Sequence, residues 1–261
     1  MKPVRYVLLS PSGNLTALVT GTWETADEPE ITRRLLQVSE QVAYLEKPTK
    51  TGVLARVRLM GGEFCGNAAM AAAGWLIRDR LLEGMEETVP LEVSGTRNIL
   101  PCRIRGRKEG FEGTVPMPPI LEIWSEARFG IPLMAVRMEG ILHLVRESDT
   151  SLEKEAAENL LKAIAAQVPD AAVGLLDRNA GTGAIRPLVF VRGSGSLVWE
   201  TACGSGTAAI GAVEAMRQGK TAETAVPQPG GIIRASAVFR KGQFPSVSIT
   251  GAVKILSESD L

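Results

Sequence analysis

The sequence has very few of the residues that mark metalloproteins and nucleic-acid-binding proteins. Its 261 residues include one histidine and three cysteines, and no Cys-x-x-Cys pair occurs, so we expect no metal site. Lysine and arginine together number 29, as do aspartate and glutamate. The basic excess typical of a nucleic-acid binder is therefore missing, and we expect no nucleic-acid partner.

Long apolar runs are also missing. The first apolar stretch, between Val4 and Leu9, is too short for a secretory signal, and nowhere do the roughly 18 consecutive apolar residues of a membrane span occur. An odd number of cysteines in a chain without an export signal indicates free thiols in a reducing compartment. We therefore expect a cytoplasmic protein with no membrane partner.

What the chain does contain is typical of a globular protein. Apolar residues make up 45% and charged residues 22%, and the length suits one large domain or two of about 130 residues each. Short segments that alternate between apolar and polar residues predict many strands. These segments are 4–9, 15–19, 53–59, 91–93, 99–104, 111–115, 135–138, 141–145, 188–191, 197–199, 232–239 and 247–249.

Four helices are predicted, of two kinds. Pro29–Val38 and Ser151–Gln167 have the polar and apolar faces of surface helices, and the second is expected to begin at Ser151. Gly66–Arg78 and Gly204–Arg217 are rich in small residues, and the first is apolar on nearly all sides. A helix that is apolar on nearly all sides is usually enclosed by other parts of the protein.

The two enclosed helices indicate an internal duplication. Each follows a Cys-Gly pair, at Cys65 and at Cys203, and the two pairs are separated by about half the chain. The Pro-rich segment 116–119 is a natural junction. We therefore expect two domains, 1–118 and 119–261, with the last strands able to cross back to the first half.

A cysteine at the start of a helix has distinctive chemistry. Unpaired backbone N–H groups and the positive end of the helix dipole favour the thiolate, and they can lower the pKa of the thiol well below its usual value of about 8.5. The same N–H groups can bind a small carboxylate. Two such thiols on opposite sides of an α-carbon could remove a proton from one face and return one to the other. Cys102 lacks this context, and we interpret it as a small buried hydrophobe.

The segments GGEFCGNAAMAA and WETACGSGTAA resemble the two signatures of the diaminopimelate epimerase superfamily of cofactor-independent amino-acid racemases and epimerases. Weaker matches at residues 12–14, 41–48, 140–145, 229–231 and 250–252 extend the resemblance over nearly the whole chain. The resemblance implies an α/β fold of two pseudo-symmetric domains, each a curled mixed or antiparallel sheet around a central helix. It also implies an amino-acid substrate and no cofactor.

Carried over by position, the resemblance implies a set of site residues. Cys65 and Cys203 would be the two catalytic proton-transfer groups. The implied substrate-binding residues are Asn14, Gln41, Gly66, Asn67, His143, Glu200, Gly204 and Ser205.

The departures from the family pattern concern the distal end of the substrate. Diaminopimelate epimerases have an asparagine near Leu188 and an arginine directly after the Trp-Glu pair, whereas this sequence has Pro187 and Thr201 there. A buried distal charge without its partners would cost several kcal/mol. In this respect the chain is similar to the histidine racemases of opine metallophore pathways, and we expect a substrate such as histidine or another ordinary amino acid.

Several alternatives stay open. One is a diaminopimelate epimerase of lysine biosynthesis with an atypical distal pocket. Another is a phenazine-biosynthesis type of isomerase, although those proteins rely on a carboxylate instead of a cysteine pair. A protein of a different class would bind an amino acid without turnover, but such a binder needs neither thiol. The sequence does not fix the oligomeric state, and a homodimer is one candidate.

Overall fold

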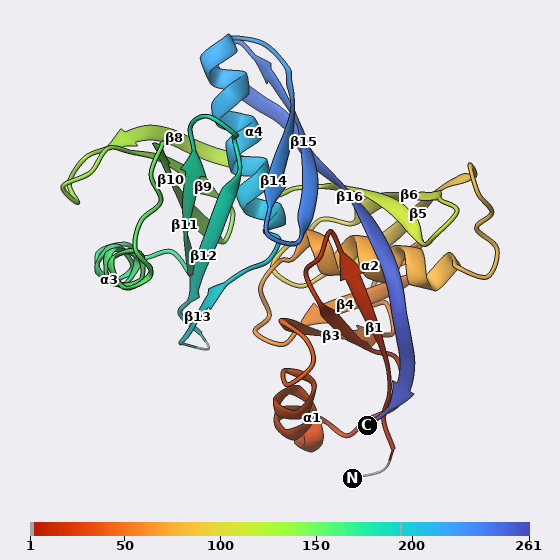
Figure 1. Cartoon of the computed structure of the whole chain (residues 1–261). Helices are drawn as coiled ribbons and strands as arrows, with labels where there is room; N and C mark the ends of the chain where they lie inside the picture. The colour runs from red at the N-terminus through yellow and green to blue at the C-terminus, as the bar shows by residue number, and fades with distance from the viewer. Residues whose placement is uncertain (1–2, 194) are drawn as a thin grey trace. The chain divides into compact units, whose positions relative to one another are not determined.

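The computed structural model describes residues 3–193 and 195–261 (Figure 1). Within those ranges it is a mixed α/β structure built mostly of strands, as the sequence predicts, with sixteen strands and four α-helices. No helix in this part of the chain combines the length and apolar character required to cross a membrane.

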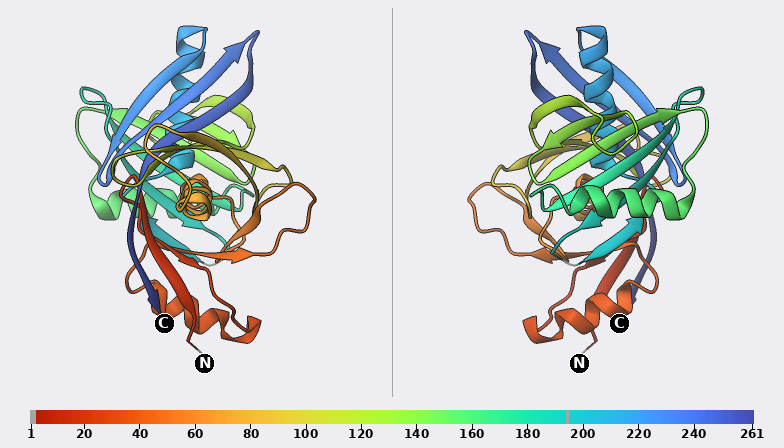
Figure 2. Two further views of the ribbon diagram at one scale, coloured as in Figure 1. Left: turned by 90° about the vertical axis from the view of Figure 1, so that its right-hand side faces the viewer. Right: turned by 90° about the vertical axis from the view of Figure 1, so that its left-hand side faces the viewer.

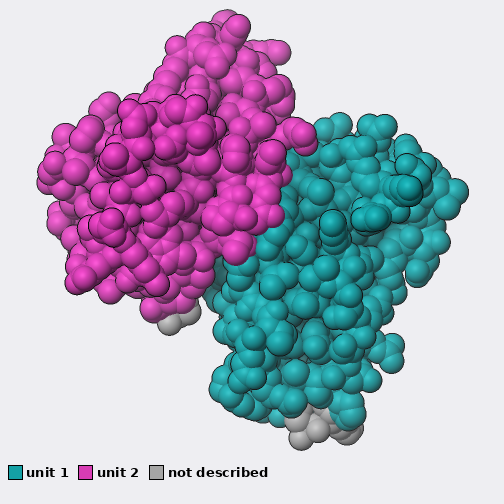
Figure 3. Space-filling model, in the orientation of Figure 1, with its two compact units in different colours: residues 1–116, 250–261 teal, residues 117–249 magenta. Residues whose placement is uncertain are grey.

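The chain folds into two compact units (Figure 3). Unit 1 contains the described residues up to Pro116 together with Thr250–Leu261, and unit 2 is Met117–Ile249. The last strand, β16 (Gln243–Asp260), therefore begins in unit 2 and ends in unit 1.

Unit 1 carries the first seven strands. They follow the order β1-β2-β3-β4-β5-β6-β7, and β1 also pairs in antiparallel fashion with the end of β16. Two pairs, β2–β3 and β4–β5, are parallel. The bounds are β1 Arg5–Pro11, β2 Thr16–Val19, β3 Gln41–Glu46, β4 Ala55–Leu59, β5 Glu86–Val93, β6 Leu100–Gly106 and β7 Phe111–Pro116, with the short 3-10 helix η1 at Thr25–Asp27 and helix α1 at Glu28–Leu35.

Helix α2 (Gly66–Ile77) lies in the interior of unit 1. Ten of its twelve residues are buried, and it contacts β1, β2 and β4 through β7. Gly74 shows why small residues are needed, because a Cβ there would lie 1.9 Å from the ring of Phe111. The burial predicted from the apolar character of this helix is confirmed.

Unit 2 contains a second sheet in the order β13-β12-β11-β10-β9-β8, in which β10 and β11 are parallel. Helix α3 (Lys154–Ala165) packs against β11 and β12, and it can be followed in the right-hand view of Figure 2. Helix α4 (Gly204–Gln218) packs mainly against β14 and β15. The strands are β8 Ile120–Glu126, β9 Leu133–Met138, β10 Ile141–Ser148, β11 Ala172–Asn179, β12 Ile185–Val191, β13 Ser196–Trp199, β14 Ala222–Gln228 and β15 Gly231–Arg240.

The start of α3 differs from its prediction. The helix begins at Lys154 instead of Ser151, with Glu153 in an extended conformation before it. The backbone N–H of Leu152 donates to Asp177 Oδ2 over 2.9 Å. This tertiary bond holds the preceding residues against β11, and a local capping pattern gives no sign of it.

Candidate active site

Cys65 is the N-cap of α2, as its position before an apolar helix predicts. Its sulfur accepts a hydrogen bond from the backbone N–H of Ala68 over 3.5 Å. The thiol donates to the side-chain oxygen Oε1 of Gln41, on β3, over 3.2 Å. Gln41 in turn donates from Nε2 to Asn14 Oδ1 over 2.8 Å. Unit 1 therefore brings Cys65 together with two predicted substrate-binding residues, Gln41 and Asn14.

Cys203 is the N-cap of α4 and is 3% exposed. The backbone N–H of Gly206 donates to its sulfur over 3.4 Å, and the hydroxyl of Ser205 lies 3.6 Å from the sulfur. Gln228 holds the backbone here, because its Oε1 accepts from the N–H of Cys203 over 2.7 Å and its Nε2 donates to Thr207 Oγ1 over 2.8 Å. Sequence reasoning missed Gln228, because nothing in the sequence pattern around it, at the end of β14, marks it out.

The electrostatics of Cys203 oppose the prediction of a lowered thiol pKa. Burial raises its pKa well above the usual value, and the nearby carboxylate of Glu200, which is hydrogen-bonded to the thiol, raises it further. The hydroxyl of Ser205 and the N–H of Gly206 act in the opposite direction with smaller effect. The helix N-terminus thus contributes as expected, but desolvation of the thiolate outweighs it, and Cys203 rests as a thiol.

His143, on β10, is completely buried in unit 2. Its Nε2 lies 2.9 Å from the hydroxyl oxygen of Ser205, and its Nδ1 has no hydrogen-bond partner among the described residues. Burial lowers the pKa of His143 to about 3, so the imidazole is neutral at physiological pH. The adjacent strand residue is Gly174, where a Cβ would lie 2.2 Å from Nδ1.

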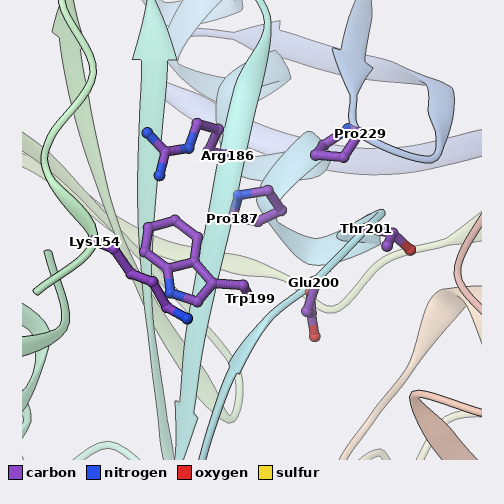
Figure 4. Close-up of a pocket in the computed structure, with 7 residues that line it drawn as sticks. All are labelled: Lys154, Arg186, Pro187, Trp199, Glu200, Thr201 and Pro229. Carbon is purple, nitrogen blue, oxygen red and sulfur yellow. The ribbon is translucent and has the colours of Figure 1, made fainter.

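A pocket of about 340 Å³ opens beside Glu200 in unit 2 (Figure 4). The guanidinium of Arg186 lies over the Trp199 ring at 4.9 Å, and the indole N–H of Trp199 donates to Glu158 Oε1 over 3.0 Å. Its lining includes Pro187 and Thr201, the positions at which the sequence departs from diaminopimelate epimerases. The full lining is Lys154, Arg186, Pro187, Trp199, Glu200, Thr201 and Pro229.

The remaining predicted residues lie in the first turns of the two helices. Gly66 and Asn67 open α2 and are buried, while Gly204 and Ser205 open α4. Unit 2 thus brings Cys203 together with Ser205, His143 and Glu200.

Cys102 is fully buried on β6, and burial raises the pKa of its thiol to about 12, in agreement with its interpretation as a small hydrophobe. Across residues 3–193 and 195–261, no three histidine, cysteine, aspartate or glutamate side chains gather as a metal-binding group.

Comparison with known proteins places this architecture in a class. A family model described as the histidine racemase CntK N-terminal domain matches residues 3–261. Curated histidine racemases from Staphylococcus aureus and Fusobacterium nucleatum are each 27% identical to the chain. The first alignment covers 88% of this chain and 87% of the relative, and the second covers 79% and 78%.

A solved structure described as a predicted epimerase from Pseudomonas aeruginosa has a TM-score of 0.73 at 18% identity, over 99% of both chains, and so shares the fold. The protein is an isomerase of the racemase and epimerase class. Within that class, the chain belongs to the family described as the histidine racemase CntK N-terminal domain.

Proposed function

We propose that the protein racemises a free amino acid at its α-carbon by a two-base thiol mechanism without a cofactor. The observation that carries this proposal is the repeated arrangement of Cys65 and Cys203, each capping a largely buried helix and each accepting a backbone N–H from that helix. Membership in a racemase family supports the same chemistry. A carboxylate-binding protein would need the N–H groups but neither thiol.

In the proposed reaction, one cysteine as thiolate removes the α-proton and leaves a carbanion. The other cysteine, as thiol, gives its proton to the opposite face of the α-carbon. One C–H bond breaks and another forms, so the product is the mirror image of the substrate. General acid–base assistance of this kind contributes about 10²- to 10⁴-fold for each positioned group.

The other predicted residues have supporting roles in this proposal. Backbone and side-chain donors of Gly66, Asn67, Gly204 and Ser205 would bind the α-carboxylate, as helix N-termini bind anions. Asn14, Gln41, His143 and Glu200 would orient the amino group or the thiols. We also propose that residues 1–118 and 119–261 are pseudo-symmetric functional halves, with their sheets curled around α2 and α4.

For the substrate we propose histidine. The curated relatives that match the chain are histidine racemases, and residues that hold the distal groups of diaminopimelate are replaced by Pro187 and Thr201 in the lining of the pocket. A site that leaves polar groups of a substrate unpaired can reject it by about 10⁴-fold or more. Diaminopimelate is the substrate to compare with histidine. Its distal carboxylate is negatively charged, and the same pocket carries the cationic side chains of Lys154 and Arg186.

The test is exchange of the α-proton in heavy water, followed by proton NMR and chiral chromatography. L-histidine, L-diaminopimelate and other L-amino acids are incubated separately without pyridoxal phosphate, with and without a chelator. We expect histidine to lose its α-proton signal and form the D-enantiomer at the same rate with chelator present. Faster turnover of diaminopimelate would overturn the proposed substrate, and binding of histidine without exchange would overturn the proposed activity.

A further inference from the structure

A chain of hydrogen bonds in unit 1 leads from a carboxylate to Cys65. Asn14 donates from Nδ2 to Glu40 Oε2 over 3.2 Å, and the other carboxylate oxygen of Glu40 accepts from the backbone N–H of Leu15 over 3.3 Å. Asn14 Oδ1 accepts from Gln41 Nε2, and Gln41 Oε1 accepts from the thiol of Cys65. Glu40 has no part in the proposed function so far.

The direction of this chain follows from the chemistry of its first member. A carboxylate can only accept, so the atom of Asn14 that faces Glu40 must be its NH₂ group. The carbonyl oxygen of Asn14 then points the other way, and the atom of Gln41 that faces it must also be an NH₂ group. Gln41 consequently turns its carbonyl oxygen toward the sulfur of Cys65.

Thr16 reinforces the same orientation. Its hydroxyl donates to Asn14 Oδ1 over 3.3 Å and accepts from Gln41 Nε2 over 2.7 Å. Thr16 is fully buried and Asn14 is 4% exposed, so exchange of these bonds with water is restricted. The Gln41 amide therefore has two acceptors on its nitrogen side and the thiol on its oxygen side.

We propose that Glu40 is a positioning residue that, through Asn14 and Gln41, keeps the proton on Cys65. A carbonyl oxygen stabilises a thiol that donates to it and repels a thiolate in the same place. Cys203 has a different partner, the carboxylate of Glu200. A carboxylate can take up a proton, whereas the amide oxygen of Gln41 cannot.

This difference assigns the starting role of base to Cys203 and of acid to Cys65. The assignment rests on the proposed two-base function. To begin the reaction, the Cys203 thiol loses its proton through Glu200 to water, and the resulting thiolate removes the α-proton. Cys65 gives its own proton to the opposite face. The Cys65 thiolate that remains faces a carbonyl oxygen and regains a proton from water, which balances the proton that Cys203 lost at the start.

The experiment measures the rate at which iodoacetamide alkylates Cys65 between pH 6 and pH 10, with the labelled peptide quantified by mass spectrometry. In Glu40→Gln, the side chain at position 40 can donate as well as accept. The side-chain amides of Asn14 and Gln41 can then both rotate by a half turn, so that Gln41 presents its NH₂ group to the sulfur of Cys65. We expect the Cys65 alkylation rate at pH 7.5 to rise about fivefold, and the midpoint of its pH dependence to fall. Glu30→Gln, an exposed carboxylate on α1, is the matched control and should match the wild type.

A second variant keeps the proposal testable if Glu40→Gln does not fold. Gln41→Met removes the carbonyl acceptor at similar size, and Cys65 should again be alkylated faster at pH 7.5. Unchanged alkylation of Cys65 in a folded variant of either kind would overturn the proposal. Alkylation needs no turnover, so histidine racemisation assayed on the same samples separates failure of this inference from failure of the proposed function.

Discussion

At the scale of single residues, the two signature cysteines differ in what surrounds them. Cys65 is half-buried and donates to an amide oxygen, whereas Cys203 is buried and hydrogen-bonded to the carboxylate of Glu200. Matching sequence motifs therefore produce two chemically unlike thiols. In the proposed mechanism the two thiols act on opposite faces of one carbon, and they need not be chemically equivalent.

Replacing either signature cysteine tests its role directly. In Cys65→Ser and Cys203→Ser we expect histidine racemisation to fall by about 10²- to 10⁴-fold or more, because a hydroxyl is a far weaker base than a thiolate. Folding should persist, as judged by circular dichroism. The control is Cys102→Ala instead of serine, since a hydroxyl at this fully buried position would lack a hydrogen-bond partner. Turnover close to wild type in either signature variant would contradict the two-base mechanism.

The raised pKa of Cys203 predicts a pH effect with a definite sign. In the proposed mechanism Cys203 must lose a proton to act as a base, so kcat/KM should rise with pH between 7 and 9. In Glu200→Gln the negative neighbour is gone, so the pKa of Cys203 falls and the rising limb should move to lower pH, even if the maximum rate drops. Glu155→Gln, an exposed carboxylate in the first turn of α3, should leave the limb in place. A limb that does not move in Glu200→Gln would show that another group controls it.

At the scale of elements, the parallel pair β10 and β11 positions the imidazole beside Ser205. His143 lies opposite Gly174 in this pair, and the absence of a side chain at Gly174 leaves room for the ring. Gly174→Ala should displace the ring and weaken the bond to Ser205, at a cost of about 1–3 kcal/mol in the free energy of unfolding. Urea denaturation measures this cost. The control is Gly193→Ala, where a Cβ would meet nothing within 4 Å; equal effects of the two changes would contradict the packing argument.

Much of the element pattern could be predicted from sequence. The periodicity and capping signals placed α2 and α4 at the correct first residues, because a change from strand to an Ala- and Gly-rich helix is marked locally. The alternating strands were equally visible. Four strands, β3, β8, β11 and β14, lie outside the predicted alternating segments. β11 is buried along nearly its whole length and shows no alternation, and β14 contains Pro227.

The contacts within the site could be predicted only in part. Family resemblance implied Gln41 and His143 as substrate-binding residues, which stays a prediction, but it did not imply that Gln41 would accept from Cys65 or that His143 would contact Ser205. Those contacts join residues distant in the chain and depend on strand register. The prediction of a lowered pKa for the Cys203 thiol failed for a related reason. Burial of Cys203 is a tertiary property, and its effect on the pKa outweighs the local effect of the helix N-terminus.

At the scale of the whole molecule, one histidine couples protonation to stability. The pKa of His143 is about 3 in the folded protein and about 6.5 when unfolded, so the unfolded chain binds an extra proton between these values. Stability is therefore fully present above pH 6.5 and is lost as the pH falls. Between pH 7 and pH 5 the loss should be about 2 kcal/mol in the free energy of unfolding.

This loss can be attributed cleanly, because His143 is the only histidine in the sequence. Urea denaturation at pH 7 and pH 5 should give a large difference for the wild type and little for His143→Gln. The carboxylates are the same in both proteins, so their titration cancels in the comparison. An equal loss in the two proteins would show that the imidazole is not held neutral.

The path of β16 has a consequence for how the protein is made. Arg5 to Pro11 in β1 pair with residues from Val253 to Asp260, so this pairing can form only after the more than 240 residues between the two segments have been synthesised. Until residue 260 has emerged, β1 lacks that partner and its edge is open to other chains. Residues 117–249 of unit 2 are synthesised entirely within this interval. Unit 1 is thus completed only after residues 117–249 of unit 2 have been synthesised.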